Sequence, residues 1–350
     1  MSKRIWFLLA AALLLVFFAA CGDESDAVAE TGGNVPGESV PGGNVPGEEL
    51  VEGDFLIASL QIVAHPALDA SRRGFVTGLA EEGFSVGRNL RFEVFDAGGS
   101  GADAHLMAAQ IVDMNPDLIL GIATPTSQAL AGATDTIPIT ITAVTSPYNA
   151  GLVESHERPN TNVTGTTDMT PVSLQFELIT RIFPEAETVG ILYNAGESNA
   201  VIQANIAEEA AASLGINLDR MTVAVAGDVM QAAEILVGRV DVIYTPTCNL
   251  MAASMTAIVR AAENLGVPVV AGDGGGVERG ALITYGINYY ELGRQTAQMA
   301  AQILRGEAQP QTMPIQAQAQ YEFFVNISSA EILDIAIPED ILAIATLFAD

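Results

Sequence analysis

The chain repeats one order of short apolar runs and longer alanine-rich stretches, and this duplication limits the folds open to it. Runs rich in Val and Ile, which favour strands, cover residues 55–63, 90–95, 117–122 and 137–144, and then 188–193, 222–225, 241–244 and 267–271. Stretches with helical periodicity lie at about residues 68–82, 103–114 and 126–133, and then 199–214, 229–237 and 250–265. Apolar strands joined by helices predict a parallel sheet covered on both faces.

Local matches between the halves support the duplication. Pro116-Asp117-Leu118-Ile119 corresponds to Val240-Asp241-Val242-Ile243, and each is followed by Thr-Pro-Thr, at 124–126 and at 245–247. We therefore predict an α/β protein of two doubly wound parallel-sheet lobes. Ligands bind outside the carboxyl ends of the strands in such sheets, so both lobes should direct those ends into one ligand cleft.

The length of the chain leaves room for two lobes after an N-terminal segment. We expect lobe 1 at residues 55–145, with return segments from about 282–306. We expect lobe 2 at residues 146–281, with part of the C-terminal segment 307–350.

The N-terminus has the parts of an export signal. Lys3 and Arg4 precede an uncharged apolar run at 5–20, whose last residues, two alanines, adjoin Cys21. This order predicts a signal peptide at 1–20. A cysteine directly after the cut resembles a bacterial lipobox, although Phe18 stands where Leu is usual. The alternatives are an ordinary signal peptide or an uncleaved anchor helix, for which the run is short. We predict an extracytoplasmic protein anchored to the outer face of the cell membrane by a lipid on Cys21.

Residues 21–54 predict a disordered acidic linker behind that lipid. From residue 22 to 54 there are nine acidic residues and no basic one, and the heptapeptide GGNVPGE occurs twice. Such a segment cannot bury enough apolar surface to offset the entropy of its chain. The spacing of its carboxylates matches no calcium-binding loop.

Charge and cysteine content exclude several function classes. The formal net charge is −28, from 42 acidic and 14 basic residues, so phosphate backbones would repel the protein and we expect no nucleic-acid partner. The cysteines are Cys21 and Cys248, which leaves no intramolecular disulfide once Cys21 is acylated. The three histidines lack the spacing of zinc ligands, and we expect neither a metal nor a cofactor.

In lobe 1, candidate ligand-binding residues follow the predicted strands. The segment after the third strand begins a helix, whose free N–H groups and hydroxyls suit a carboxylate; N-capping with Pro in the first turn is the alternative. His65 lies at the end of the first predicted strand, and the pair Thr145-Ser146 follows the fourth. The lobe 1 candidates are His65, Thr124, Thr126, Ser127, Gln128, Thr145 and Ser146.

In lobe 2, polar residues follow the corresponding strands. These candidates are Asn194, Ser198, Asn199, Thr247, Asn249 and Asp273. Asp273 is the acidic side chain that we expect to pair with a ligand's ammonium group, and a turn cap is its alternative role. Glu197 is expected only to compensate a helix dipole. The glycines after Asp273 lack the order of a phosphate-binding loop and predict a backbone turn beside the ligand.

Several segments together resemble one known family. They are HPALDASRRGF, ATPTSQALAGAT, AVTSPYNAGLV, NVTGTTDMTPV, GILYNAGESNAV and YGINYYELGRQTAQMAAQIL. They are similar to the substrate-binding lipoproteins of an ABC-importer family that includes binders of tryptophan and other aromatic amino acids. The resemblance implies the type I periplasmic-binding architecture and an ABC permease as partner. Relatives usually carry Asp where Cys248 stands, and we interpret Cys248 as a small apolar cleft or core residue.

These observations favour an extracytoplasmic solute-binding lipoprotein of an ABC importer. We expect it to be a monomer that captures an amino-acid-like ligand, aromatic or large and apolar, by hinged closure of its lobes. The first alternative is a two-lobed enzyme acting on a small amino acid, but Cys248 has no second thiol opposite it and no G-x-S-x-G occurs. The second is a ligand-sensing ectodomain, which no attached signalling module supports.

Overall fold

The computed structural model describes residues 54–349, which all belong to one compact unit. The predicted signal peptide, Cys21 and the linker up to residue 53 lie outside the described residues. Within the described part of the chain, no helix has the length and apolar character to cross a membrane.

The first sheet has six strands, all parallel, in the order β11-β5-β4-β3-β1-β2. Its strands are β1 (Phe55–Gln61), β2 (Leu90–Asp96), β3 (Leu118–Ile122), β4 (Ile139–Val144), β5 (Val163–Thr167) and β11 (Gln316–Ala317). The central strands β3, β4 and β5 are buried along their whole length, as a sheet covered on both faces requires.

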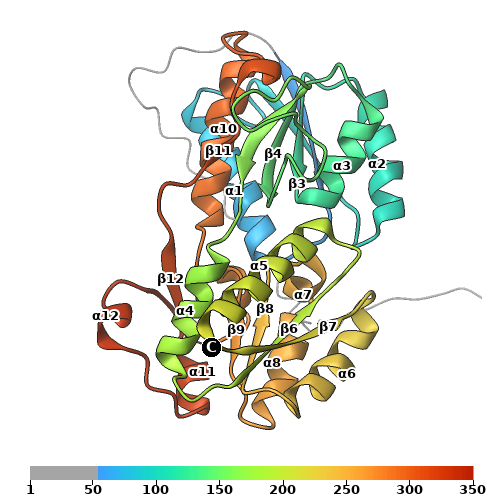
Figure 1. The fold of residues 1–350 in the computed structure, drawn as a ribbon. Coiled ribbons are helices and arrows are strands. Elements are labelled where there is room, and N and C mark those ends of the chain that lie inside the picture. Colours follow the sequence, from blue (N-terminus) through green and yellow to red (C-terminus); the bar gives the residue numbers. More distant parts are fainter. Residues whose placement is uncertain (1–53, 350) are drawn as a thin grey trace, which may run out of the picture. The chain divides into compact units, whose positions relative to one another are not determined.

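The second sheet has seven strands in the order β13-β12-β10-β9-β8-β6-β7, with β12 antiparallel to β10. Its strands are β6 (Thr188–Tyr193), β7 (Asn217–Thr222), β8 (Val242–Thr245), β9 (Val269–Ala271), β10 (Ile283–Gly286), β12 (Glu322–Asn326) and β13 (Thr346–Phe348). Each sheet forms the centre of its own hydrophobic core. The prediction of two parallel-sheet α/β lobes is confirmed (Figure 1).

Helices cover both sheets. Around the first sheet, α1 packs on α10 and α2 packs on α3; around the second, α4 packs on α5 and α6 on α8 (Figure 1). The helices are α1 (Pro66–Glu81), α2 (Gly101–Asp113), α3 (Thr124–Ala133), α4 (Val172–Ile182), α5 (Ser198–Leu214), α6 (Ala226–Val237), α7 (Asn249–Ala253), α8 (Met255–Glu263), α9 (Gly274–Glu278), α10 (Tyr289–Leu304), α11 (Ile327–Ile332) and α12 (Glu339–Leu342), with a 3₁₀ turn at Pro310–Thr312.

The two lobes share the interactions that begin their sheets. Asp117 precedes β3, and its Oδ2 accepts a 2.7 Å hydrogen bond from the Leu56 amide at the start of β1. Asp241 precedes β8, and its Oδ2 accepts a 2.9 Å hydrogen bond from the Thr188 amide at the start of β6. The two Thr-Pro-Thr segments, however, do not occupy equivalent positions in the lobes. The first begins helix α3 at Thr124, whereas the second begins at Thr245, the last residue of β8, and precedes helix α7.

Three elements differ from the sequence prediction. Strand β5 was not predicted, because its threonines give it a polar sequence. These threonines can be buried because their hydroxyls form hydrogen bonds; the Thr164 hydroxyl, for example, donates to the Met313 carbonyl. Strand β7 lies earlier than the predicted 222–225, because it is a half-exposed edge strand with polar residues. The predicted helix 250–265 is two helices, α7 and α8, which meet at Ser254.

The sheets also divide the chain differently from the expected boundaries. Residues 163–167 were expected in lobe 2 but form β5 of the first sheet, and β10, expected among the return segments to lobe 1, belongs to the second sheet. We therefore define each lobe by its sheet and the helices packed on it. The chain crosses between the lobes at residues 168–171, 287–288 and 318–321.

Two glycines bring α10 against α1. A Cβ atom at Gly74 would lie 1.9 Å from the Tyr290 carbonyl oxygen, and one at Gly293 would lie 1.9 Å from the Ser71 carbonyl oxygen. No larger residue fits at either position without moving a backbone. This close contact fixes the start of α10, and therefore Tyr289, beside the carboxyl end of β5 in the first sheet.

Candidate functional site

A cavity lies between the lobes, beyond the carboxyl ends of the strands. It is lined by His65, Leu68, Ala143, Thr145, Asp168, Asn199, Thr247, Cys248, Asn249, Ala252, Asp273 and Tyr289. The space left between these side chains is small, about 10 Å³. A solute can therefore occupy the site only if these side chains or the lobes move apart.

Six of the residues predicted from the sequence line this cavity. They are His65, Thr145, Asn199, Thr247, Asn249 and Asp273. Each follows a strand of one of the two sheets, so the expectation that carboxyl ends from both lobes meet at one place agrees with this arrangement. The cavity also contains residues that the sequence did not indicate, above all Asp168 and Tyr289.

Three polar side chains of the cavity have atoms without a hydrogen-bond partner among the described residues. They are Oδ1 of Asp168, Oδ1 of Asn199 and both ring nitrogens of His65. All three side chains are more than nine-tenths buried. Leaving a buried polar atom unpaired costs free energy, so convergence of such atoms indicates a place built to receive polar groups.

Asp168 follows β5 directly and is 3% exposed. Its Oδ2 accepts a 2.7 Å hydrogen bond from the Tyr289 hydroxyl. Burial raises the pKa of Asp168 to about 6, although the Tyr289 and Thr145 hydroxyls lower it, and the nearby charge of Asp273 adds to the increase. Above this pH the site contains a desolvated carboxylate that favours a positively charged partner.

Asp273 is the N-cap of α9, and its Oδ1 accepts a 3.1 Å hydrogen bond from the Gly276 amide. The capping role considered as its alternative is therefore real. Burial is the largest cause of the raised pKa values of Asp168 and Tyr289, and the negative charge of Asp273 raises both further. For Tyr289, the charge of Asp168 has a larger effect than that of Asp273. Asp273 thus caps a short helix and also contributes to the potential in the cavity.

His65 is the N-cap of α1 but makes no side-chain capping hydrogen bond. Burial lowers the pKa of His65, and the negative charge of Asp273 and the nearby Asn249 side chain raise it by a smaller amount. Asn249 is not within hydrogen-bond geometry of either ring nitrogen. The imidazole is therefore neutral at pH 7, with one N–H donor and one acceptor.

On the lobe 2 side, Glu197 organises the cavity wall. Its carboxylate accepts hydrogen bonds from the amides of Asn249 (2.8 Å) and Leu250 (3.0 Å) and from the Asn249 side chain (2.6 Å). It therefore holds the start of α7, instead of only compensating the dipole of its own helix. The Cys248 thiol also donates to Glu197, and burial together with the charge of Glu197 raises the thiol pKa. Cys248 is thus a neutral, buried wall residue, as the sequence predicted.

Gln203 in α5 connects the two lobes beside the cavity. Its amide nitrogen donates to the Thr145 hydroxyl after β4 at 3.3 Å and to the Thr247 hydroxyl, and its amide oxygen accepts from the Thr247 amide at 3.1 Å. Sequence reasoning missed Gln203, because it lies in the interior of a helix with ordinary periodicity.

Seven predicted residues do not line the cavity. The Thr126 hydroxyl donates to the Ile122 carbonyl at the end of β3, and the Ser127 hydroxyl donates to the Ala123 carbonyl. Gln128 donates to the Ala150 carbonyl, and Ser146 accepts from Asn149. Asn194 accepts from the Gly196 amide, and Ser198 is the first residue of α5. Thr124 is buried with an unpartnered hydroxyl. Contact between these residues and a ligand remains a prediction.

A signal for Asp168 existed in the sequence. Four of the five residues of Val163–Thr167 are β-branched, and an acidic residue directly follows the segment. A strand there would have placed Asp168 at a carboxyl end like the other site residues. Tyr289 offered no such signal, since its position depends on the packing of α10 against α1.

The lobes also touch at α9. A Cβ atom at Gly275 would lie 2.8 Å from the Ala67 amide nitrogen and 3.2 Å from Pro66 Cβ in lobe 1. Gly275 therefore permits a close approach between lobes and does not turn beside the cavity, because it is absent from the cavity lining.

Comparison with known proteins places these features among transport proteins. A family model described as ABC transporter substrate binding protein matches residues 56–348. A tyrosine-binding protein of Clostridioides difficile is 34% identical over 274 residues, which cover 78% of this chain and 79% of the relative.

Two solved structures are informative about the arrangement of the lobes. An ABC domain from Streptococcus pneumoniae in complex with L-Trp is 31% identical, with a TM-score of 0.81, over 85% of this chain and 100% of the other. A ligand-free, open substrate-binding protein with adhesive properties from Clostridium difficile is 37% identical, with a TM-score of 0.65, over 84% and 99%. The chain thus superposes better on the L-Trp complex despite the lower identity. In this chain, contacts across the cavity, such as that of Gln203 with Thr145, hold the lobes in a closed arrangement.

Proposed function

Because the chain belongs to the family of ABC transporter substrate-binding proteins, with the type I periplasmic-binding fold, we propose that its cavity binds one L-amino acid with an aromatic or large apolar side chain. The protein is an extracytoplasmic component of an importer and presents a small molecule to a membrane permease. The ligands of its relatives, tyrosine and L-Trp, support the amino-acid class.

The unpartnered polar atoms carry this proposal. Among the described residues, Oδ1 of Asp168 and Oδ1 of Asn199 are acceptors without a donor, and an ammonium group supplies three donors. We assign Asp168 as the direct partner of the ammonium, in preference to Asp273, one oxygen of which is engaged in capping α9. Asp273 then adds negative potential from lobe 2.

The remaining groups suit the other parts of such a ligand. His65 is neutral and offers an N–H to a carboxylate or a hydroxyl oxygen. Leu68, Ala143, Ala252 and Cys248 supply an apolar wall, against which an apolar side chain can be buried. A sugar would leave the Asp168 carboxylate buried without a counter-charge, which is unfavourable.

We further propose how the protein is held and how it works. The sequence supports anchoring by a lipid on Cys21, action as a monomer, and no role for nucleic acid or a cofactor. The alternative of an enzyme lacks support at the cavity, because the raised pKa of Cys248 leaves its thiol protonated and Glu197 is already hydrogen-bonded to α7. No observation favours a sensor ectodomain.

A ligand panel tests the proposal. The mature protein is heated with amino acids, sugars, nucleosides and short peptides; a ligand that binds only the folded state raises the melting temperature. We expect increases with aromatic or large apolar L-amino acids, and none with the Asp168→Asn variant. Increases with sugars or nucleosides alone would show that the proposed ligand class is wrong. Native mass spectrometry identifies any solute that copurifies.

A further inference from the structure

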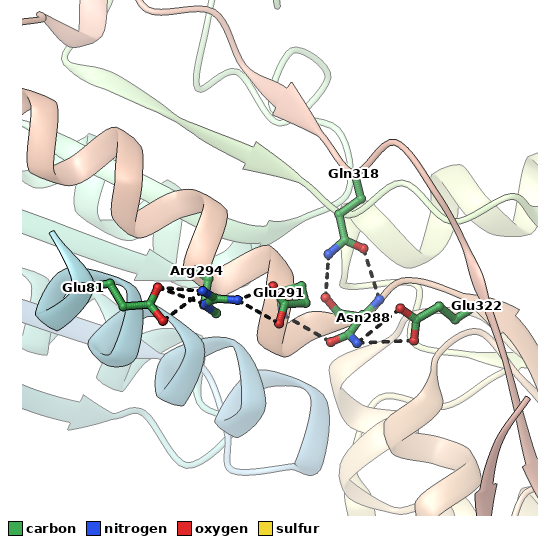
Figure 2. Close-up of polar contacts among 6 residues, drawn as sticks. All are labelled: Glu81, Asn288, Glu291, Arg294, Gln318 and Glu322. Carbon is green, nitrogen blue, oxygen red and sulfur yellow. Dashed lines mark hydrogen bonds and ion pairs between the residues drawn. The ribbon is translucent and has the colours of Figure 1, made fainter. Parts of the chain in front are cut away.

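The three crossovers between the lobes are linked to one another by hydrogen bonds. The second crossover, 287–288, and the third, 318–321, lie next to each other at Asn288 and Gln318 (Figure 2). The Gln318 amide oxygen accepts from the Asn288 amide at 3.1 Å, and its amide nitrogen donates to the Asn288 carbonyl at 2.7 Å. One side chain thus replaces the backbone pairing that a neighbouring strand would provide.

The Asn288 side chain extends this link to both lobes. Its Oδ1 accepts from the Glu291 amide in the first turn of α10, which belongs to lobe 1. Its Nδ2 donates to the Glu322 carboxylate, at 3.3 and 3.4 Å, where β12 of lobe 2 begins (Figure 2). Asn288 is therefore held at once by lobe 1, by lobe 2 and by Gln318.

The helix α10 is fixed to the rest of lobe 1. Arg294 donates to both oxygens of Glu81 in α1, at 2.9 and 2.7 Å, and to Glu291 at 2.9 Å (Figure 2). The contacts of Gly74 and Gly293 add to this attachment. Relative motion of the lobes must therefore be taken up in the crossovers, on the lobe 2 side of Tyr289.

The same link reaches the cavity. Tyr289 follows Asn288 in the chain, and its hydroxyl donates to Asp168, the first residue of the crossover 168–171. All three crossovers are thus connected, in the order Gln318, Asn288, Tyr289, Asp168. Asn288 and Gln318 are half-buried, whereas Tyr289 and Asp168 are buried.

We propose that Gln318 is a positioning residue for ligand capture: it holds the second and third crossovers together in the closed arrangement and so places Tyr289 against Asp168, without touching the ligand. This inference rests on the proposed function, because it assumes that closure around a solute is the working motion. Removing the Gln318 amide favours separation of the lobes and faster ligand dissociation. The binding wall itself stays unchanged.

The test compares Gln318→Met with a matched control. Methionine keeps the length of the side chain and removes both hydrogen bonds. The control is Gln295→Met in α10, which removes hydrogen bonds from Gln295 to Gln316 and Ala317; these lie within lobe 1. Spin labels at the exposed positions Gln110 in α2 and Glu234 in α6, in a Cys21→Ser background, report the distance between lobes.

We expect Gln318→Met to increase the open population of the ligand-free protein and to raise the dissociation constant of the amino acid identified by the panel about tenfold, mostly through faster dissociation. Tenfold corresponds to about 1.4 kcal/mol, the order expected for two half-exposed neutral hydrogen bonds. Gln295→Met should match the wild type in both measurements.

Equal lobe distances and dissociation rates in Gln318→Met and wild type would overturn the inference. A lower melting temperature with unchanged distances would do so too, because it would mean that Gln318 only stabilises the fold. If no amino acid binds the wild type, the proposed function fails, while the distances in the ligand-free protein still decide the role of Gln318.

Discussion

The Tyr289 hydroxyl donates a 2.7 Å hydrogen bond to Oδ2 of Asp168, and both side chains are buried. Asp168 begins the first crossover between the lobes, and Tyr289 directly follows the second. The bond orients the Asp168 carboxylate and leaves Oδ1 without a partner within residues 54–349. It joins a strand end to a helix start that lie 121 residues apart. The buried Asp168 carboxylate is therefore an unfavourable charge, which a cationic group of a ligand can neutralise.

Asp168→Asn should stabilise the ligand-free protein at neutral pH and abolish binding. The folded pKa of about 6 lies above the ordinary aspartate value of 3.8, so ionisation at pH 7.5 opposes folding by about 3 kcal/mol, at 1.36 kcal/mol per pH unit. Asparagine removes this charge and can still accept from Tyr289. Thermal unfolding at pH 7.5 should show a higher melting temperature, with the difference vanishing below about pH 4. A lower melting temperature at pH 7.5 would contradict the assignment.

Ligand affinity should fall as the pH decreases below about 6. The ammonium group needs ionised Asp168, so protonation of the free protein competes with binding, about tenfold per pH unit in this range. The groups facing Asp168 are Tyr289, Thr145 and Asp273; His65 in the same cavity has a lowered pKa and, once protonated, would repel the ammonium further. Calorimetry between pH 4.5 and 8 measures this profile. Tyr289→Phe should move its acid limb to higher pH, because Tyr289 lowers the Asp168 pKa.

Asp273→Asn should move the same limb in the opposite direction. The negative charge of Asp273 raises the pKa of Asp168, so its removal lets Asp168 ionise at lower pH. Asparagine retains an oxygen for the Gly276 amide and preserves the cap. We expect weaker binding at pH 7.5, since negative potential is lost, with little change in melting temperature. An unchanged dissociation constant and an unchanged acid limb would leave Asp273 as a helix cap alone.

Cys21→Ser should release the protein from the membrane. The order of basic, apolar and small residues before Cys21 predicts lipidation at this position. Fractionation of cells should find the wild type with membranes and the variant in the soluble fraction. Mass spectrometry should identify a lipid-bearing Cys21 peptide, and a mature chain that still begins at Met1 would exclude this processing.

Much of the lobe architecture could be predicted because buried parallel strands are apolar along their length. The sequence therefore predicted strands β3 and β4, and it also predicted the candidate residues that follow β1, β4, β8 and β9. Strand β5 escaped because its buried faces are threonines, satisfied by partners far away in sequence, such as Thr296. Missing β5 meant missing Asp168, the residue with the most informative chemistry in the cavity.

The other omissions arise from contacts between distant segments. Tyr289 reaches the cavity because Gly74 and Gly293 let α10 approach α1. Gln203 connects the lobes because α5 of lobe 2 lies close to Thr145, which follows β4 of lobe 1. Neither relationship leaves a periodic pattern in the local sequence, since each depends on how two completed elements pack.

Gly275→Val should hold the lobes apart. A Cβ atom added at this position would lie 2.8 Å from the Ala67 amide nitrogen and 3.2 Å from Pro66 Cβ in lobe 1, and 3.0 Å from Asp273 Oδ1 in its own lobe. Backbone atoms cannot move aside cheaply in a packed helix start. Separation of the lobes removes the two contacts with lobe 1 and leaves only the Asp273 side chain to adjust, so the melting temperature of the ligand-free protein should change little. We expect the dissociation constant to rise at least tenfold, and the distance between labelled lobes to stay long when ligand is added. Gly132→Ala in α3, where an added Cβ atom meets nothing within 4 Å, is the control and should bind like the wild type. Wild-type affinity in Gly275→Val would mean that the lobes do not need this contact to capture a ligand.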